Sequence, residues 1–201
     1  MRTAFLTPKP EEPTFDCRTP GGARLVRRPD RSLASLIREE SRLSHFGRCL
    51  LATGLFEDLD EGGSYTVFAP LDSAFELSPT AFEGWFARET TSLLFDVAEF
   101  HVTRGIWSEP PPPGRVPSLE GRSLTLEWAS DRLLVNRQAL VQETWLAKNG
   151  LLHLTDKLLI PSGIQLEPDG SLAAEAGDRP SGMRLVYPSA AENLGVARQF
   201  E

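Results

Sequence analysis

The chain has 201 residues, of which 40% are hydrophobic and 24% charged, and its formal net charge is −7 at pH 7. This composition is typical of a globular protein and excludes a chain that is disordered throughout. The negative charge disfavours general binding to nucleic acid, because carboxylates and phosphates repel each other. Two cysteines, Cys17 and Cys49, are too few for a disulfide framework, and their spacing fits no zinc motif.

The sequence contains neither the pattern of an export signal nor that of a membrane span. Pro8, Pro10, Glu11 and Glu12 interrupt the N-terminal residues before an apolar stretch of signal length can form. No apolar run approaches the ~18 residues that a membrane-spanning helix needs. We therefore expect a soluble, cytoplasmic protein without a transmembrane segment.

Residues 1–30 are predicted to form an extended, proline-rich arm. Proline recurs every few positions there, and the segment lacks helical or strand periodicity. The arm contains the apolar pair Phe5 and Leu6 and ends in a basic cluster with two apolar residues inside it: Arg24, Leu25, Val26, Arg27 and Arg28. Such a cluster is either a solvated flank or a docking peptide for an acidic or apolar surface.

Residues 31–162 are predicted to form the folded domain, which begins with helices. Ser32 is a candidate N-cap, and the apolar residues after it fall on one helix face: Leu33, Leu36, Ile37 and Leu43. A second short helix follows and ends at Gly54, because glycine readily adopts the left-handed conformation of a helix C-terminus. Further helices are expected over 73–88 and 89–100, after a β-rich run at 65–69.

The later part of the domain is predicted to be β-structure. The apolar period changes to two, which indicates strands over 123–128, 132–136, 139–143 and 150–159. Before them, the four consecutive prolines of segment 106–117 predict an extended surface loop, in which Trp107 is a candidate exposed anchor. Helices followed by strands are typical of the α+β class.

Residues 163–201 are predicted to form an extended, low-complexity C-terminal tail. Glycine, alanine, serine, glutamate and proline dominate this segment, so it cannot bury enough surface to fold alone. Its one apolar island contains Leu185, Val186 and Tyr187, which suit docking to a groove or a sheet edge.

Three separated segments resemble the fasciclin domain family. The family's first signature is similar to residues 65–75, YTVFAPLDSAF, and its second signature to residues 149–161, NGLLHLTDKLLIP. Between them, Phe100 and His101 look like the family's aromatic–histidine element. The resemblance covers about residues 31–162 and leaves both tails outside it.

This resemblance implies a compact wedge in which a twisted β-sandwich packs against several helices, with no cofactor and no catalysis. It also implies a role in adhesion, matrix contact or protein–protein interaction. The acidic–aliphatic dipeptide that animal relatives use to contact integrins is absent, because Leu140 and Val141 occupy that neighbourhood. Animal-style cell adhesion is therefore not expected.

Candidate chemical groups have ordinary structural interpretations. His101 and His153 are expected inside the protein, hydrogen-bonded to backbone or hydroxyl groups, since burial of an unpaired imidazole is costly. His45 and Cys49 are four residues apart on a predicted helix and could share a metal ion. The structural interpretation is that His45 lies at the end of the helix and Cys49 in the core. No catalytic motif is present, so we expect no enzyme, no cofactor and no metal.

Two functions are compatible with these patterns. The first is a non-enzymatic interaction or scaffold module whose arms dock on a protein partner or on a neighbouring subunit of a homo-oligomer. Its candidate partner-binding residues lie in the two arms and the proline loop: Phe5, Leu6, Arg24, Leu25, Val26, Arg27, Arg28, Trp107, Leu185, Val186 and Tyr187. The alternative is a carrier of a small apolar ligand such as a pigment or lipid.

Overall fold

The computed structural model describes residues 17–18, 24–61, 63–75, 79–106, 113–130 and 132–175. The expectations for Phe5, Leu6, Trp107 and residues 185–187 concern positions outside these ranges. Among the described residues, no helix is both long and apolar enough to cross a membrane.

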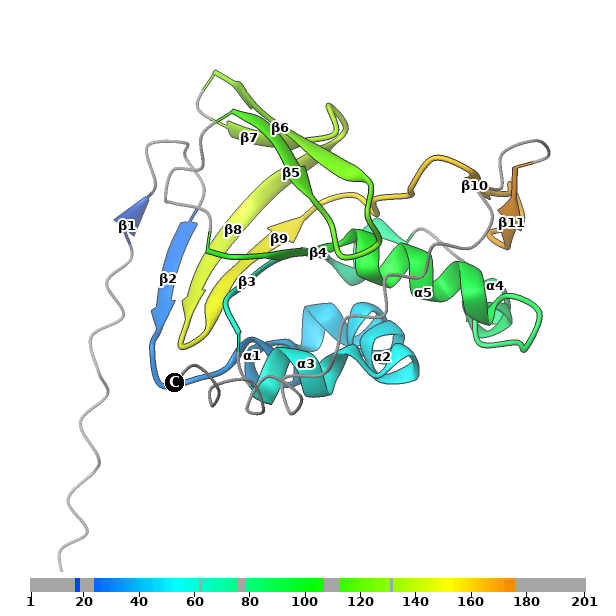
Figure 1. Cartoon of the computed structure of the whole chain (residues 1–201), viewed down its shortest axis with the longest axis horizontal. Helices are drawn as coiled ribbons and strands as arrows, with labels where there is room; N and C mark the ends of the chain where they lie inside the picture. The colour runs from blue at the N-terminus through cyan, green and yellow to red at the C-terminus, as the bar shows by residue number, and fades with distance from the viewer. Residues whose placement is uncertain are drawn as a thin grey trace, which may run out of the picture.

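A strongly curved sheet forms the centre of the molecule (Figure 1). Its main path joins seven strands in spatial order: β4 (Val102–Arg104), β3 (Tyr65–Pro70), β9 (Gly150–Thr155), β8 (Ala139–Ala147), β7 (Arg132–Val135), β6 (Ser123–Ala129) and β5 (Gly114–Pro117). An isolated bridge between Thr103 and Ser118 brings the far end of this path back to β4. The sheet is therefore twisted and nearly closed, which agrees with the expected β-sandwich wedge.

Strand β8 belongs to both halves of the sheet. Its first residues, Ala139 and Leu140, pair with β7, and a bulge lies between Val141 and Glu143. Beyond this bulge, residues 143–147 pair on one side with β9 and on the other with β2 (Arg24–Arg28). The β2–β8 pairing is parallel, whereas β8 and β9 form an antiparallel hairpin through Lys148 and Asn149.

Short helices cover one face of this sheet. They are α1 (Leu33–Glu39), the 3₁₀ turn η1 (Ser41–Leu43), α2 (Ser44–Thr53), α3 (Leu55–Glu61), the 3₁₀ turn η2 (Asp72–Ala74), α4 (Pro79–Gly84) and α5 (Thr91–Phe100). Ser32 caps α1 by accepting a hydrogen bond from the Ser35 amide at 3.1 Å. Gly54 ends α2 in the left-handed conformation with φ of 75°. Figure 1 shows α1, α2 and α3 together below the strands.

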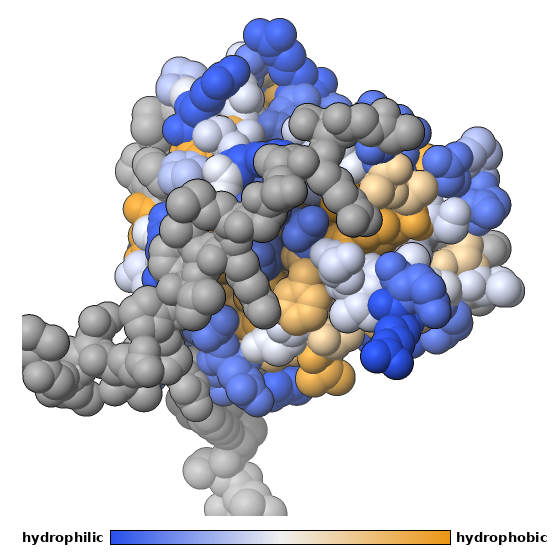
Figure 2. All heavy atoms as spheres, turned by 45° about the vertical axis from the view of Figure 1, so that its right-hand side comes forward, coloured by the Kyte–Doolittle hydropathy of each residue, from blue (hydrophilic) through white to orange (hydrophobic). Residues whose placement is uncertain are grey.

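Side-chain alternation along the strands separates two hydrophobic cores. On β3, Val67 and Ala69 point to the core beneath the helices, and Phe68 points to the core between the two halves of the sheet. Figure 2 brings the α4–α5 end forward and shows hydrophobic side chains at the surface, divided by polar ones. Leu93, Leu119 and Ile160 are half-buried members of the helical core.

Two segments differ from the expectation of extended tails outside residues 31–162. Residues 24–28 form a strand of the main sheet, with β1 (Cys17–Arg18) antiparallel to it on its outer side. After residue 162, β10 (Ile164–Leu166) and β11 (Leu172–Ala174) form a hairpin. Ile164 and Leu172 enter the helical core, and Trp85 Nε1 donates to Gly170 O at 2.8 Å. The packed body therefore extends beyond both expected boundaries, because tertiary contacts order segments that have weak patterns of their own.

Candidate interaction surface

Strand β2 places the predicted basic cluster at the edge of the sheet. Val26 is buried with 6% of its surface exposed, while Arg24 and Arg27 are exposed and Leu25 and Arg28 are half-buried. Because successive side chains point to opposite faces, Arg24, Val26 and Arg28 share the helix-covered face, and Leu25 and Arg27 share the other. The expectation of a freely extended cluster is thus corrected: its central apolar residue packs against this chain's own sheet.

The register with β8 sets the neighbours of each β2 residue. Arg24 lies opposite Glu143, and Val26 lies opposite Trp145, whose half-buried ring packs against the helical core. On the opposite face, Leu25 is aligned with Thr144. The parallel pairing therefore brings a buried valine to a tryptophan and an arginine to a carboxylate.

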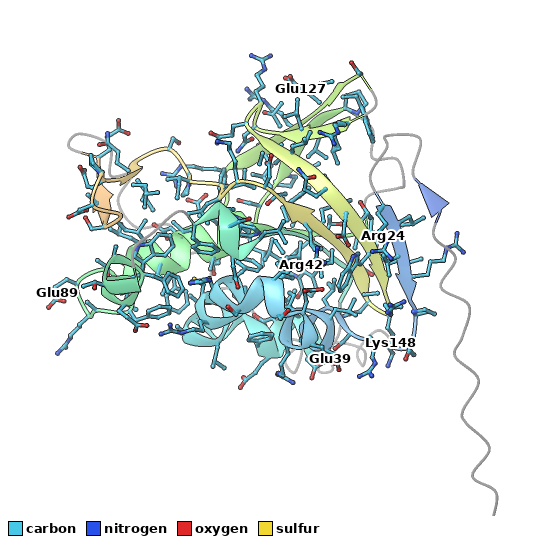
Figure 3. The ribbon with its side chains drawn as sticks, turned by 180° about the vertical axis from the view of Figure 1, so that it is seen from behind. Arg24, Glu39, Arg42, Glu89, Glu127 and Lys148 are labelled. Atoms are coloured by element: carbon cyan, nitrogen blue, oxygen red, sulfur yellow. The ribbon has the colours of Figure 1, made fainter. Side chains whose placement is uncertain are left out.

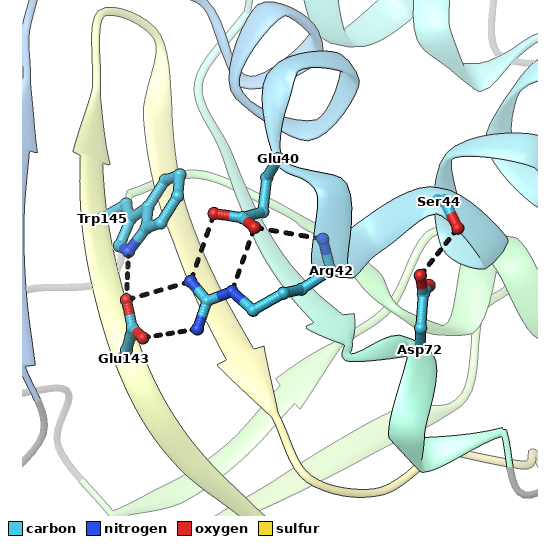
Figure 4. A network of polar contacts seen from close by, with 6 residues as sticks. All are labelled: Glu40, Arg42, Ser44, Asp72, Glu143 and Trp145. Carbon is cyan, nitrogen blue, oxygen red and sulfur yellow. Dashed lines mark hydrogen bonds and ion pairs between the residues drawn. The ribbon is translucent and has the colours of Figure 1, made fainter.

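A polar network joins this part of the sheet to the helices (Figure 4). Arg42 Nη1 donates to Glu143 Oε1 at 2.8 Å, and Arg42 Nε donates to Glu40 Oε1 at 3.0 Å. Trp145 Nε1 donates to the other Glu143 oxygen, Oε2, at 2.9 Å. One guanidinium thus bridges a carboxylate before η1 and a carboxylate on β8.

The charges in this network stabilise one another. Partial burial opposes ionisation of Glu143, but hydrogen bonds from Arg42 and Trp145 hold the pKa of its carboxyl below the ordinary glutamate value. A side-chain hydrogen bond from Arg42 likewise lowers the pKa of Glu40. The same two carboxylates raise the pKa of Arg42. Glu40, Arg42 and Glu143 are therefore an internally satisfied set rather than free charges.

Asp72, which belongs to the first signature segment, caps α2 (Figure 4). Its Oδ2 accepts from Ser44 Oγ at 2.6 Å, and its Oδ1 accepts from the His45 amide at 2.8 Å. Partial burial opposes ionisation, yet these bonds lower the pKa of Asp72 below its ordinary value. The structure thus assigns Asp72 to the start of α2.

His101 is a buried structural histidine. Its Nδ1 lies 2.7 Å from Val97 O, and its Nε2 accepts from the Leu159 amide at 3.0 Å. This pattern requires a neutral ring with the proton on Nδ1. Burial lowers the pKa of His101 to about 4, so the ring stays neutral near pH 7.

His153 is also inside the protein, as expected. Its Nδ1 lies 2.9 Å from Thr144 Oγ1, and its ring stacks on Phe68 with the centroids 5.2 Å apart. Burial lowers the pKa of His153 to about 4. His101 and His153 are therefore buried, neutral rings and present no ionisable group at the surface.

Cys49 and His45, the candidate metal pair, are both held by contacts within the fold. Cys49 is buried, and burial raises the pKa of its thiol to about 12. His45 Nδ1 lies 3.0 Å from Asp72 Oδ1, and the ring is 4.4 Å from that of Phe82. Within the part of the chain that the structure describes, no three histidine, cysteine or acidic side chains are grouped so that they could hold a metal ion.

A comparison with protein families identifies the domain. The family model described as "Fasciclin domain" matches residues 41–161, from η1 through β9. The chain belongs to the fasciclin domain family. β2, α1 and the β10–β11 hairpin lie outside the matched residues, so this fasciclin domain carries packed segments on both sides of the family region.

Curated relatives agree with this assignment. The chain is 31% identical over 112 residues to protein sll1483 of Synechocystis, covering 55% of this chain and 62% of the relative. Human periostin is 28% identical over 142 residues, which cover 69% of this chain and 17% of periostin. The cell surface glycolipoprotein MPB83 of Mycobacterium bovis is 34% identical over 104 residues, covering 52% of this chain and 47% of MPB83. The chain thus spans less than two thirds of the length of each of these relatives.

A solved structure shows the same fold. The domain pair of the insect cell adhesion molecule Fasciclin I matches with a TM-score of 0.51 and 15% sequence identity. The match covers 66% of this chain and 52% of that one. The expected fasciclin-like wedge is therefore confirmed at the level of the fold.

Sequence analysis singled out residues 24–28 as a basic cluster but predicted no strand there, and it missed the residues that surround β2. Glu143 was placed at the end of a predicted strand, and Trp145 just after it, because that strand was expected over 139–143 only. Continued alternation of Val141, Glu143 and Trp145 was the available signal. No local sequence pattern indicated a role for Arg42, because its partner Glu143 on β8 is distant in the sequence.

Proposed function

We propose that this fasciclin domain is a non-enzymatic protein-interaction module. The observation that carries the proposal is that the signature segments provide the interior of the domain: Phe68 of the first and His153 of the second stack on each other in the core. Functional contacts would then be made by the surface around this interior, and proteins use such surfaces chiefly to bind other proteins.

The chemistry of the described residues supports this proposal. His101 and His153 bond inside the fold, Cys49 is a buried neutral thiol, and Asp72 caps a helix. A catalytic site requires a nucleophile, base or acid that reaches a bound substrate. These four residues instead serve the fold.

The finer part of the proposal concerns assembly. We propose that the segments flanking the family region, rather than a cleft within it, contact the partner. Strand β2 lies outside the matched residues, forms a sheet edge and carries exposed arginines. A scaffold or accessory role in a larger complex, formed in the cytoplasm, follows as a hypothesis from this arrangement.

Affinity capture of the full chain from the cells that make it, with reconstitution from purified components, tests this proposal. A complex of defined stoichiometry in analytical ultracentrifugation is the expected result. Absence of any reconstituted complex, together with substrate turnover by the purified chain, would contradict it. Solvent extraction of the same preparation tests the alternative role as a carrier of a small apolar ligand, and cell fractionation tests the location.

A further inference from the structure

The outer edge of β2 offers backbone for one more strand. On its inner side, all five residues from Arg24 to Arg28 are aligned with β8. On its outer side, β1 is aligned with Arg24 and Leu25 only. Among the residues that the structure describes, Val26, Arg27 and Arg28 have no strand on that side. Edge strands of this kind are natural places for an extended segment to add to a sheet.

Arg27 and Arg28 give this edge positive charge. Arg31, in the turn directly after β2, contacts Asp30 and Glu39. Elsewhere in the body, each of four arginines also contacts a carboxylate: Arg42, Arg48, Arg122 and Arg137. By contrast, within the described ranges the side chains of Arg27, Arg28 and the exposed Lys148 form no ion pair, and Arg28 Nη1 donates to the Arg27 carbonyl oxygen at 3.1 Å. A cationic edge on a chain of net charge −7 is a local reversal of sign.

The side chains extend along both faces of the edge. Arg27 projects to one face, and Arg28 projects to the helix-covered face. Figure 3 shows Arg24 beside β2 and Lys148 at the neighbouring end of the β8–β9 hairpin, with Glu89 and Glu127 elsewhere on the molecule. A strand docked here would therefore meet cations on both faces.

We propose that the outer edge of β2 at Val26–Arg28 binds an extended acidic segment of a partner protein, which joins the sheet antiparallel to β2. The antiparallel direction is the one that β1 already adopts on this side. Opposite charges directly across a strand pair are favourable, and like charges are unfavourable. The arginines therefore select an acidic segment and disfavour a second copy of this edge, which would place arginine against arginine.

This inference rests on the proposed interaction function and names the surface and the chemistry of the partner. The probe is a fluorescein-labelled peptide, acetyl-EVEVEVE-amide, titrated with the full chain and followed by fluorescence anisotropy. Saturable binding is expected, with NMR amide shifts at Val26–Arg28. The Arg27→Glu/Arg28→Glu variant is expected to bind at least about tenfold more weakly, because a favourable cross-strand charge pair becomes repulsive and the charge of the neighbouring residue is reversed as well.

Matched reagents distinguish strand addition from simple charge attraction. The Arg88→Glu/Arg132→Glu variant changes the net charge by the same amount at exposed arginines away from β2, and is expected to bind within about threefold of the parent chain. The peptide EVEPEVE keeps the charge but loses a backbone donor at its centre, and should bind much more weakly. Equal binding of both peptides, or of an eight-nucleotide DNA strand, would overturn the proposal.

Two further outcomes also count against it. No binding of any peptide would mean that the arginines only protect the edge from aggregation. Tighter peptide binding by an Asp16→Lys variant would identify this chain's own N-terminal residues as the occupant. If a partner captured from cells binds the Arg27→Glu/Arg28→Glu variant as well as the parent, the proposed function stands and this inference alone fails.

Discussion

Arg42 donates to Glu143, a residue 101 positions later in the chain, with 2.8 Å between Nη1 and Oε1. This contact joins η1 on the helical face to β8 in the sheet, the strand with which β2 pairs. Side chains of Glu40 and Glu143 are each only 15% exposed, so their negative charges depend on this guanidinium. The contact therefore links the stability of the helices to that of the β2 edge.

Replacement of Arg42 by alanine is expected to destabilise the fold by about 1–3 kcal/mol, because two largely buried carboxylates lose their cation. Urea unfolding followed by tryptophan fluorescence measures the change. Arg137→Ala is the matched control, since Arg137 is 79% exposed in its pair with Glu127 and such a pair contributes less than about 1 kcal/mol. Equal effects of the two substitutions would show that the Arg42 network is not a stabilising unit.

Local chemistry explains which elements the sequence could predict. Ser32 and Gly54 act through bonds and dihedral angles within a few residues, so the ends of α1 and α2 were readable. Strands were also predicted at residues 65–69 and 150–159; the structure has β3 at Tyr65–Pro70 and β9 at Gly150–Thr155, so the second strand ends four residues earlier than predicted. The two strands pair parallel, with Phe68 opposite His153.

Long-range pairing explains what the sequence could not predict. Strand β2 has only two apolar residues among five, and its partner on β8 lies more than a hundred residues away. Its pattern is equally compatible with a solvated flank, and only the sheet edge of β8 decides between the two. The candidate surface needs this pairing as well, because the arginines form an edge only once Val26 is buried.

A second prediction concerns acid stability. The pKa of His101 and the pKa of His153 are each lowered by burial to about 4, below the ordinary histidine value of 6.5. The unfolded chain therefore binds up to about two more protons than the folded chain between pH 4 and 6.5. The contribution of the two histidines to the free energy of unfolding is fully present above pH 6.5. As the pH drops toward 4, this free energy is expected to fall by up to about 2.7 kcal/mol per pH unit.

Urea unfolding at half-unit steps from pH 7.5 to pH 4 measures this slope. A His153→Gln variant should lose about half of the slope between pH 5 and 6, because one proton-binding difference is removed. His45→Gln is the control, since that ring is not fully buried. A pH-independent free energy of unfolding across this interval would contradict the assignment of both rings as buried and neutral.

Gly150 tests the close approach of β3 and β9. A Cβ atom at this position would lie 2.0 Å from the Tyr65 carbonyl oxygen, and backbone cannot move aside as a flexible side chain can. Gly150→Ala is expected to destabilise the fold by more than about 3 kcal/mol or to prevent folding. Gly84→Ala, where nothing lies within 4 Å of the added carbon, should be nearly neutral in thermal unfolding monitored by circular dichroism. Similar melting temperatures for both variants would refute the tight β3–β9 contact.

The β10–β11 hairpin should contribute to the stability of the body although it follows the family region. Leu172 is 5% exposed in the helical core, and Gly170 O accepts the indole hydrogen bond of the fully buried Trp85. Leu172→Ala is expected to cost about 2–4 kcal/mol, because it leaves a cavity beside the aromatic residues of that core. Leu166→Ala in the same hairpin removes a side chain that is 38% exposed and should cost less than about 1 kcal/mol. Guanidinium unfolding followed through tryptophan emission compares the two. Equal costs would mean that the hairpin only rests on the surface, whereas the expected difference would place residues 164–174 within the cooperative unit.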